Sequence, residues 1–409
     1  MGRLALLLPL LALVLGAAAS AGPTPVLAIK AERGRPVALE RLDGATLRPV
    51  GRSVPLRNHG RAWSLSPDRS RLVLALAGEA GQTFPLSLRF VDLRAMRVAR
   101  DVRLKGEADG RVRATAWTGH GRVLVLLTYD GAPGGRLLLV DAGEGGVLQR
   151  RDLPTDRWVI GGSYTRDGFV LLLAPQTSIR PVRLLVVDDG LRVRSVVLDR
   201  IRAGSRQRVD GEGYTMQRRE PGLAVDDAGG RAYVVGAGEP VASVDLRRLR
   251  VTYRPLAERA PAVARKSLDG PVRTAVWLGG GLVAVSGTTY GGLDERRRIV
   301  EEPAGLHLVD TRTGASRLVD PGASSVLHAG GRLVTHVDGR GLSGFDLEGM
   351  ERWTALAGAQ IAGAQVAGRS IVVVTDHGEV FVLEAASGRV LGRPRGPVPQ
   401  LLGDAAPIW

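Results

Sequence analysis

The sequence lacks cysteine altogether, and among its 409 residues it has one asparagine, Asn58, and three lysines, Lys30, Lys105 and Lys266. Without cysteine the chain can form no disulfide and no cysteine-ligated zinc site, and no lipid can be attached to a signal-peptide cysteine. Aromatic residues make up only 4% of the sequence. A folded core must therefore consist mainly of valine, leucine and alanine.

Long apolar runs are also scarce, and the clearest one lies at the N-terminus. Leu4 to Leu15 is apolar, follows a positively charged start, and precedes the small residues Ala19-Ser20-Ala21. This run is shorter than the roughly 20 residues that a transmembrane helix needs, and the whole pattern is typical of a cleavable export signal. We therefore expect residues 1–21 to be a signal peptide and residues 22–409 to be exported, to the periplasm, the cell wall or the extracellular space. An uncleaved membrane anchor is the alternative.

The formal net charge is +15, and almost all of the positive charge is arginine. A basic exported protein can attract anionic wall polymers, polysaccharides or lipid headgroups over long range. The alternative is that the basic side chains are simply solvated and bind no partner. The arginines are spread along the whole chain, without a basic patch that alternates with aromatic residues, so we expect no nucleic-acid partner.

The sequence repeats a short unit. In each copy an apolar run ends in an acidic residue, which is followed by a turn and then by a second strand. In each turn the acid can accept hydrogen bonds from backbone amides. A second unit, a short strand, a tight turn and a strongly apolar strand, precedes each of the last seven copies, as in TAWTGHGRVLVLL. The eight acids are Asp43, Asp92, Asp141, Asp188, Asp245, Asp310, Asp346 and Glu384.

These units predict an all-β fold, a single β-propeller of four-stranded antiparallel blades. If strands a to d run outward from the central axis, residues 62–397 hold seven full sets and residues 25–52 hold three strands. The segment PVPQLLGD near the C-terminus can supply the missing innermost strand, which would close the ring with both termini. We expect eight blades; the alternative is seven, with the N-terminal strands completing the last set. Tryptophan recurs in this unit, as Trp63, Trp117 and Trp277. We expect these side chains to pack between neighbouring blades; the alternative is that they stack on a ligand.

The lengths of the connections differ between the two faces of such a ring. The a–b and c–d turns are short, whereas long segments such as 201–221, 256–271 and 287–304 fall among the b–c and d–a connections of the opposite face. Binding residues concentrate on loops held by a rigid scaffold. Arginine can hold a carboxylate or phosphate, and tyrosine can stack on a ring. Solvated insertions without function are the alternative. The candidate binding residues are Arg206, Arg208, Asp210, Glu212, Tyr214, Arg218, Arg219, Tyr290, Asp294, Glu295, Arg296, Arg297 and Arg298.

Catalytic and metal-binding motifs are not found. The sequence has no phosphate-binding glycine loop, no HExxH and no GxSxG, and its six histidines are scattered. The acidic pairs Asp188-Asp189 and Asp226-Asp227 lack the alternating spacing of a calcium loop. We expect no cofactor, no metal and no catalytic residue.

Two sets of repeats resemble known propeller repeats. VDDAGGRAYVVGAGEPVASVDLRRLRV and SPDRSRLVLALAG resemble YVTN-type repeats, and LERLDGATLRPV, LVDTRTGASRLV and VLEAASGRVLG resemble quinoprotein-like (PQQ-type) repeats. The resemblance implies a β-propeller. Quinoproteins of this superfamily place an acid, an asparagine and calcium beside the quinone, often with a vicinal disulfide and a stacking tryptophan. Here cysteine is absent, the one asparagine lies near the N-terminus and the repeat tryptophan is rarely kept, so the resemblance implies no working quinone site.

From these observations we expect an exported, non-catalytic binding or scaffolding module, acting as a monomer in the cell envelope or outside it. Its partner, a protein or an anionic envelope polymer, would bind on the face of the long connections. The alternative is a propeller enzyme, either a lactonase-like hydrolase or a degenerate quinoprotein.

Overall fold

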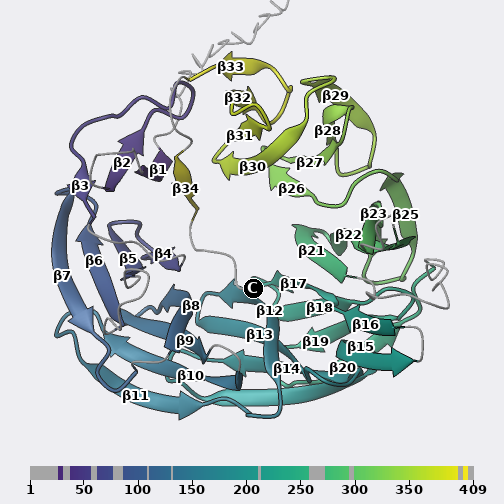
Figure 1. The fold of residues 1–409 in the computed structure, drawn as a ribbon. Helices are drawn as coiled ribbons and strands as arrows, with labels where there is room; N and C mark the ends of the chain where they lie inside the picture. The colour runs from purple at the N-terminus through teal and green to yellow at the C-terminus, as the bar shows by residue number, and fades with distance from the viewer. Residues whose placement is uncertain are drawn as a thin grey trace, which may run out of the picture.

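The computed structural model describes residues 26–30, 37–56, 62–76, 86–107, 110–129, 132–210, 213–257, 272–293, 299–394 and 399–403. Strands within these ranges form eight antiparallel sheets, which Figure 1 shows as blades arranged around a common centre. The expected signal peptide, residues 1–21, lies outside the described residues. No described helix is long and apolar enough to cross a membrane.

The first four blades, each given from its innermost strand outward, take up the N-terminal half of the chain. Blade 1 comprises β34 (Gln400–Leu402), β1 (Val26–Lys30), β2 (Ala38–Leu42) and β3 (Val54–Pro55). Blade 2 comprises β4 (Trp63–Leu65), β5 (Arg71–Leu76), β6 (Ser87–Asp92) and β7 (Arg97–Arg103). Blade 3 comprises β8 (Gly110–Trp117), β9 (Arg122–Tyr129), β10 (Ala132–Asp141) and β11 (Val147–Asp152). Blade 4 comprises β12 (Trp158–Thr165), β13 (Gly168–Ala174), β14 (Arg180–Val187) and β15 (Val193–Asp210), which also pairs with β16 (Gly213–Arg219).

The other four blades follow in the same order. Blade 5 comprises β17 (Gly222–Asp226), β18 (Arg231–Val235), β19 (Val241–Asp245) and β20 (Val251–Arg254). Blade 6 comprises β21 (Val272–Gly279), β22 (Leu282–Leu293), β24 (Leu306–Asp310) and β25 (Ser316–Asp320), and β23 (Ile299–Pro303) pairs with β22. Blade 7 comprises β26 (Leu327–Ala329), β27 (Arg332–Val337), β28 (Gly341–Phe345) and β29 (Glu351–Ala355). Blade 8 comprises β30 (Ile361–Ala367), β31 (Ser370–Thr375), β32 (Val380–Glu384) and β33 (Val390–Gly392).

Blade 1 closes the ring with strands from both ends of the chain. The C-terminal strand β34 is its innermost strand and pairs antiparallel with β1, where Leu27 faces Leu402 and Ile29 faces Gln400. The predicted closure by PVPQLLGD is therefore confirmed, and so is the eight-bladed ring; the seven-bladed alternative is wrong. Closure pairs the edge of β1 that would otherwise be open to another chain.

Aromatic side chains fill several junctions between neighbouring blades. At the junction of blades 2 and 3, Trp117 packs edge-on against Phe90 with ring centroids 5.7 Å apart, and its Nε1 donates to the carbonyl of Ser64 at 3.0 Å. At the junction of blades 5 and 6, Trp277 stacks on Tyr233 at 5.0 Å. The predicted role of these tryptophans in packing between blades is confirmed.

The acids that end or directly follow each third strand stabilise the c–d turns. Each of the seven aspartates accepts a hydrogen bond from a backbone amide of its own turn, as predicted, whereas Glu384 accepts one from the hydroxyl of Ser387 at 2.5 Å. The amide donors are Thr46, Arg94, Glu144, Arg192, Arg247, Arg312 and Met350, at 2.6–2.9 Å from Asp43, Asp92, Asp141, Asp188, Asp245, Asp310 and Asp346, respectively.

These turns predict a loss of stability in acid. The amide of Ala95 lowers the pKa of Asp92, and the amide of Arg248 lowers the pKa of Asp245, because both hydrogen bonds favour the carboxylate. A carboxyl with a lowered pKa stabilises the fold above its unfolded pKa of about 4, and the contribution disappears as pH falls through the folded value. The urea midpoint should be flat above about pH 5 and fall steadily below about pH 4. A midpoint that stays constant down to about pH 3 would contradict this account.

Candidate binding face

Two long connections form β-hairpins rather than irregular loops. Strand β15 continues past its partner β14 and turns back as β16, and strand β22 continues past β24 and turns back as β23. Neighbouring strands are antiparallel, so the second and fourth strands of all blades run in the same direction. Both hairpins therefore extend from the same face, as the sequence predicted for segments 201–221 and 287–304, and Figure 1 shows them on blades 4 and 6. Segment 256–271 lies almost wholly outside the described residues.

The predicted binding residues divide between the hairpins and the part of the chain that is not described. Arg206, Arg208 and Asp210 lie on β15, Tyr214, Arg218 and Arg219 on β16, and Tyr290 on β22. Pairing of β15 with β16 places Arg208 opposite Thr215 and Val209 opposite Tyr214, so these residues are brought together on one hairpin. Outside the described residues lie Glu212, Asp294, Glu295, Arg296, Arg297 and Arg298.

The first hairpin leaves blade 4 at a glycine that cannot be replaced without strain. Gly204 has a φ of +116°, and a Cβ there would lie 2.3 Å from the carbonyl oxygen of Ser178 and 2.5 Å from that of Pro175. The next residue, Ser205, donates its hydroxyl to the carbonyl of Gln176. The b–c turn of blade 4 thus fixes the direction in which the hairpin starts.

Glu239 fixes the base of this hairpin to blade 5. It lies in the turn between β18 and β19, where it accepts the amide of Arg202 at 3.1 Å and Nη1 of Arg219 at 3.2 Å. Burial raises the pKa of Glu239, although the amide of Arg202 and the charge of Arg219 oppose that shift. Sequence reasoning missed Glu239, because the turn GAGEP carries one acid whose partners belong to the preceding blade.

The end of the hairpin contacts blade 6. Arg218 pairs with Glu220 at 2.6 Å, and the carbonyl of Glu220 accepts the amide of Arg273 at 2.7 Å. Arg273, on the innermost strand β21, is only 5% exposed. One segment therefore joins blades 4, 5 and 6 on this face. Arg219 pairs with Glu239 of blade 5, whereas Arg218 pairs with Glu220 within the segment itself.

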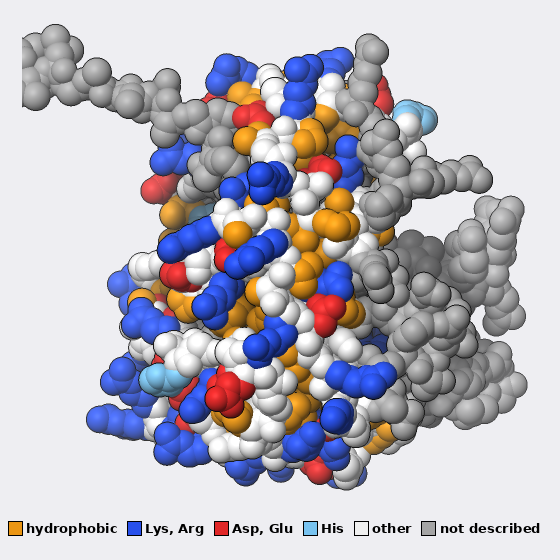
Figure 2. Space-filling model, turned by 90° about the vertical axis from the view of Figure 1, so that its left-hand side faces the viewer, with side chains coloured by type: hydrophobic (Ala, Val, Ile, Leu, Met, Phe, Trp, Pro, Cys, Tyr) orange, Lys and Arg blue, Asp and Glu red, His pale blue; other side chains and the backbone are white. Residues whose placement is uncertain are grey.

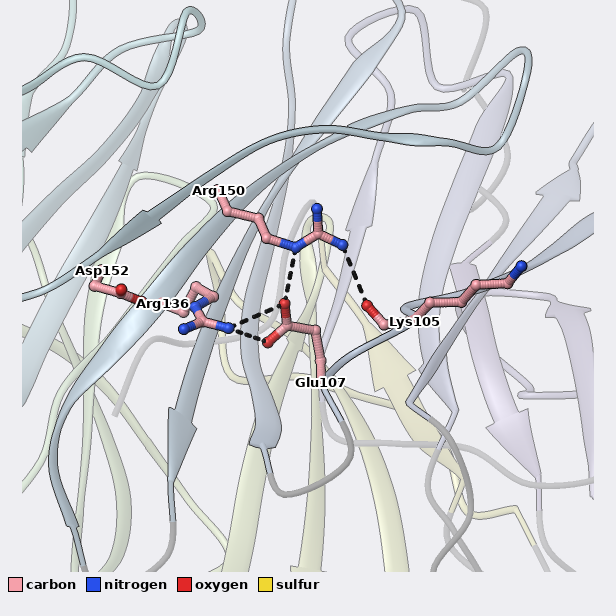
Figure 3. A network of polar contacts seen from close by, with 5 residues as sticks. All are labelled: Lys105, Glu107, Arg136, Arg150 and Asp152. Carbon is pink, nitrogen blue, oxygen red and sulfur yellow. Dashed lines mark hydrogen bonds and ion pairs between the residues drawn. The ribbon is translucent and has the colours of Figure 1, made fainter.

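Buried acids perform a similar task at two other junctions. Figure 3 shows Glu107, whose side chain is 1% exposed, between Nη1 of Arg136 and Nε of Arg150, both at 3.1 Å. This acid follows the last strand of blade 2, and both arginines belong to blade 3. Asp320, which ends blade 6 and is 1% exposed, accepts the hydroxyl of Thr335 at 2.7 Å and pairs with Arg340, both from blade 7. Acids therefore fasten blades 2 to 3, 4 to 5 and 6 to 7 on the hairpin face.

A substitution at Glu239 tests how the hairpin is held. Glu239→Ala removes the acceptor of the Arg202 amide and the partner of Arg219, and should reduce the free energy of unfolding by about 1–3 kcal/mol. It should also speed hydrogen exchange in β15 and β16. Glu239→Gln keeps an acceptor oxygen and serves as the control, with a loss below about 1 kcal/mol. Equal exchange rates in β15 and β16 for Glu239→Ala and the unsubstituted protein would show that Glu239 does not anchor the hairpin.

The two hairpin segments carry both signs of charge in near balance. Residues 205–220 hold four arginines and three acids, and residues 287–304 hold three arginines and four acids. The excess positive charge of the chain therefore lies elsewhere. Figure 2 shows Lys and Arg side chains scattered over the outer side of the ring, and Arg97, Arg100 and Arg103 on the outermost strand β7 are exposed.

Within the described ranges, no three His, Cys, Asp or Glu side chains gather in a way that could hold a metal ion. His120 lies within 3.4 Å of Asp189, on the face opposite the hairpins, and 71% of its side chain is exposed.

Comparison with known proteins yields the fold alone. No protein-family model matches the chain, and no curated protein matches it. Among solved structures it is similar to the computationally designed Ika8 protein, at 11% identity over 87% of this chain and 92% of that one, with a TM-score of 0.51. It is also similar to the dihydro-heme d1 dehydrogenase NirN, at 16% identity over 92% of this chain and 74% of that one, with a TM-score of 0.54. BamB from Moraxella catarrhalis matches at 12% identity over 82% of this chain and 88% of that one, with a TM-score of 0.45. The chain is an eight-bladed β-propeller.

Proposed function

We propose that this chain is an exported, non-catalytic binding or scaffolding module that holds a protein partner on its hairpin face. The observation that carries the proposal is the pair of hairpins, β15–β16 and β22–β23, which extend from the same face of the ring. Three consecutive blades are fastened together beneath them through Glu239 and Glu220. A rigid base with projecting strands suits recognition, because little conformational freedom is lost when a partner binds.

Charge favours a protein over an anionic polymer as the partner on this face. A polymer of one charge sign is recognised by a surplus of the opposite sign, whereas the two hairpin segments have seven arginines against seven acids. Arg218 and Arg219 are also paired with Glu220 and Glu239. The surplus arginine on the outer strands, for example on β7, contributes a weak, salt-sensitive attraction to anionic envelope material.

The proposal is tested by retention of the purified protein on isolated cell-envelope material, with and without prior proteolysis of that material. A variant with Arg206, Arg208, Arg296 and Arg297 changed to alanine leaves the ion pairs of Arg218 and Arg219 in place and should bind intact envelope about tenfold more weakly, equivalent to about 1.4 kcal/mol. Proteolysed envelope should retain both proteins poorly. The matched control changes Arg97, Arg100, Arg103 and Arg151 to alanine on the outer strands, and should lower retention only at low salt. Equal retention of the unsubstituted protein and the first variant would contradict the proposal.

A further inference from the structure

Arg183 occupies in blade 4 the position that Arg136 occupies in blade 3. Arg136 lies on β10, five residues before the turn acid Asp141. Arg183 lies on β14, five residues before the turn acid Asp188. Side chains two residues apart on a strand share a face, and Leu185 packs in the core cluster between blades 3 and 4. Arg183 therefore points towards blade 3, as Arg136 points towards the acid at the end of blade 2.

The acid at the end of blade 3 does not engage its arginine in the same way. Glu107 lies fifteen residues after the turn acid of blade 2, and Asp156 lies fifteen residues after that of blade 3. The side chain of Glu107 is 1% exposed, whereas that of Asp156 is 72% exposed. Oδ2 of Asp156 lies 3.5 Å from Nε of Arg157, on the same connection. The carboxylate of Asp156 therefore lies outside the junction, although its position in the repeat matches that of Glu107.

The neighbouring strand supplies no acid to Arg183 either. Arg136 faces Asp152 across the pair β10–β11, and its Nε lies 2.6 Å from Oδ1 of that aspartate. The residue that faces Arg183 across the pair β14–β15 is Val197. Blade 4 has thus kept the arginine of this arrangement, without either of the two acids that neutralise it in blade 3.

Two buried guanidinium nitrogens face this junction without an acceptor. Nε of Arg157 and Nε of Arg183 are buried, and no residue in the described part of the chain accepts a hydrogen bond from either atom. The side chain of Arg157 is 13% exposed, and its Nη1 donates to the carbonyl of Pro181 at 3.2 Å. Pro181 precedes Arg183 by two residues, about 7 Å along a strand, which is within reach of an arginine side chain. Buried charged donors are normally satisfied, so an acceptor from outside the chain is expected here.

We propose that Arg157 and Arg183 bind a carboxylate group from outside the chain at the junction of blades 3 and 4. This carboxylate takes the place that the carboxylate of Glu107 has between Arg136 and Arg150 at the junction of blades 2 and 3. Guanidinium groups suit it because their planar N–H donors match the two oxygens of a carboxylate. The proposal does not depend on the hairpin face binding a protein, since either a small acid or an acidic side chain can supply the group.

Sodium acetate is the first probe, with sodium chloride at equal ionic strength as the reference. In the ¹⁵N-labelled full-length protein, the Nε–H resonances of Arg157 and Arg183, assigned with R157K and R183K, should shift saturably with acetate and not with chloride. Arg183→Gln should weaken acetate binding at least about tenfold, because one of the two charged donors is lost. The matched control Arg180→Gln removes an exposed arginine at the start of the same strand, and should change the affinity less than about twofold. Circular dichroism checks that all variants fold alike.

Asp156→Glu tests the comparison with Glu107 directly. The longer side chain should bring a carboxylate of the chain itself into the junction, and should weaken acetate binding at least about tenfold by competition. Equal shifts with acetate and chloride, or equal acetate affinity of Arg183→Gln and the unsubstituted protein, would overturn the proposal. Unchanged acetate affinity in Asp156→Glu would equally overturn the assignment of the bound carboxylate to the place that corresponds to Glu107.

Two peptides distinguish the sources of the carboxylate. Acetyl-Gly-Glu-Gly-amide presents an acidic side chain, and acetyl-Gly-Gln-Gly-amide is its uncharged control. Displacement of acetate by the first peptide and not by the second would assign the site to acidic side chains of proteins. Acetate binding that neither peptide displaces would assign it to small free acids. Displacement of acetate by both peptides alike would contradict recognition of a carboxylate.

Discussion

Changing Leu401 and Leu402 together to alanine should leave the protein largely unfolded or opened at blade 1. The two side chains point to opposite faces of β34. Leu401 packs in the cluster shared with blade 8, and Leu402 in the cluster shared with blade 2. Each is 6% exposed. A buried Leu→Ala change costs about 2–5 kcal/mol, whereas a whole domain is stable by about 5–15 kcal/mol. The double change therefore removes much of the free energy of unfolding of the whole domain.

Guanidinium unfolding followed by circular dichroism, together with size-exclusion chromatography, measures this effect. The matched control is Leu318→Ala on the outer strand β25, where the leucine is 50% exposed and the expected loss is within about 0.5 kcal/mol. A loss below about 1 kcal/mol for the double variant would show that closure by β34 does not stabilise the ring.

Trp117→Ala should lower the free energy of unfolding by about 3–5 kcal/mol. The side chain is 6% exposed, contacts Phe90 edge-on and donates to the carbonyl of Ser64. Its removal leaves a cavity between blades 2 and 3 and eliminates the hydrogen bond to the carbonyl of Ser64.

Trp117→Phe separates the two contributions. Phenylalanine keeps a ring near Phe90 but cannot donate to Ser64, and its smaller size leaves part of the junction empty, so a loss of about 1–3 kcal/mol is expected. Equilibrium unfolding of both variants provides the comparison. If Trp117→Ala lost less than about 1 kcal/mol, packing by this tryptophan would not hold the two blades together.

Much of the ring could be predicted from the sequence because its signals are local. An apolar run that ends in an acid, such as that ending at Asp245, carries both the strand and the turn that follows it. The closing strand was also predictable. The N-terminal blade has only three strands of its own, and the C-terminal segment QLL is an apolar strand that no other blade needs. Register and turn chemistry act within a few residues, so one sequence suffices to read them.

Only the position of the candidate binding face could be predicted from the sequence. Segments rich in Arg, Gly and Glu appear irregular, but the halves of each hairpin satisfy one another's backbone hydrogen bonds without a strong apolar pattern. The acids Glu107, Glu239 and Asp320 could not be singled out. Each is an ordinary polar residue in its own segment, and acquires its role from arginines that the next or preceding blade brings near it.

The most direct test of the central claim shortens the first hairpin and measures binding. Residues 206–217 are replaced by Asn-Gly, a pair that favours a two-residue hairpin turn between Ser205 and Arg218, which already face each other. The contacts of Arg218 and Arg219 with Glu220 and Glu239 are kept. The melting temperature should therefore change little, while retention on intact envelope material should fall by about tenfold, equivalent to about 1.4 kcal/mol. Unchanged retention by a folded, shortened protein would contradict the assignment of binding to the hairpin face.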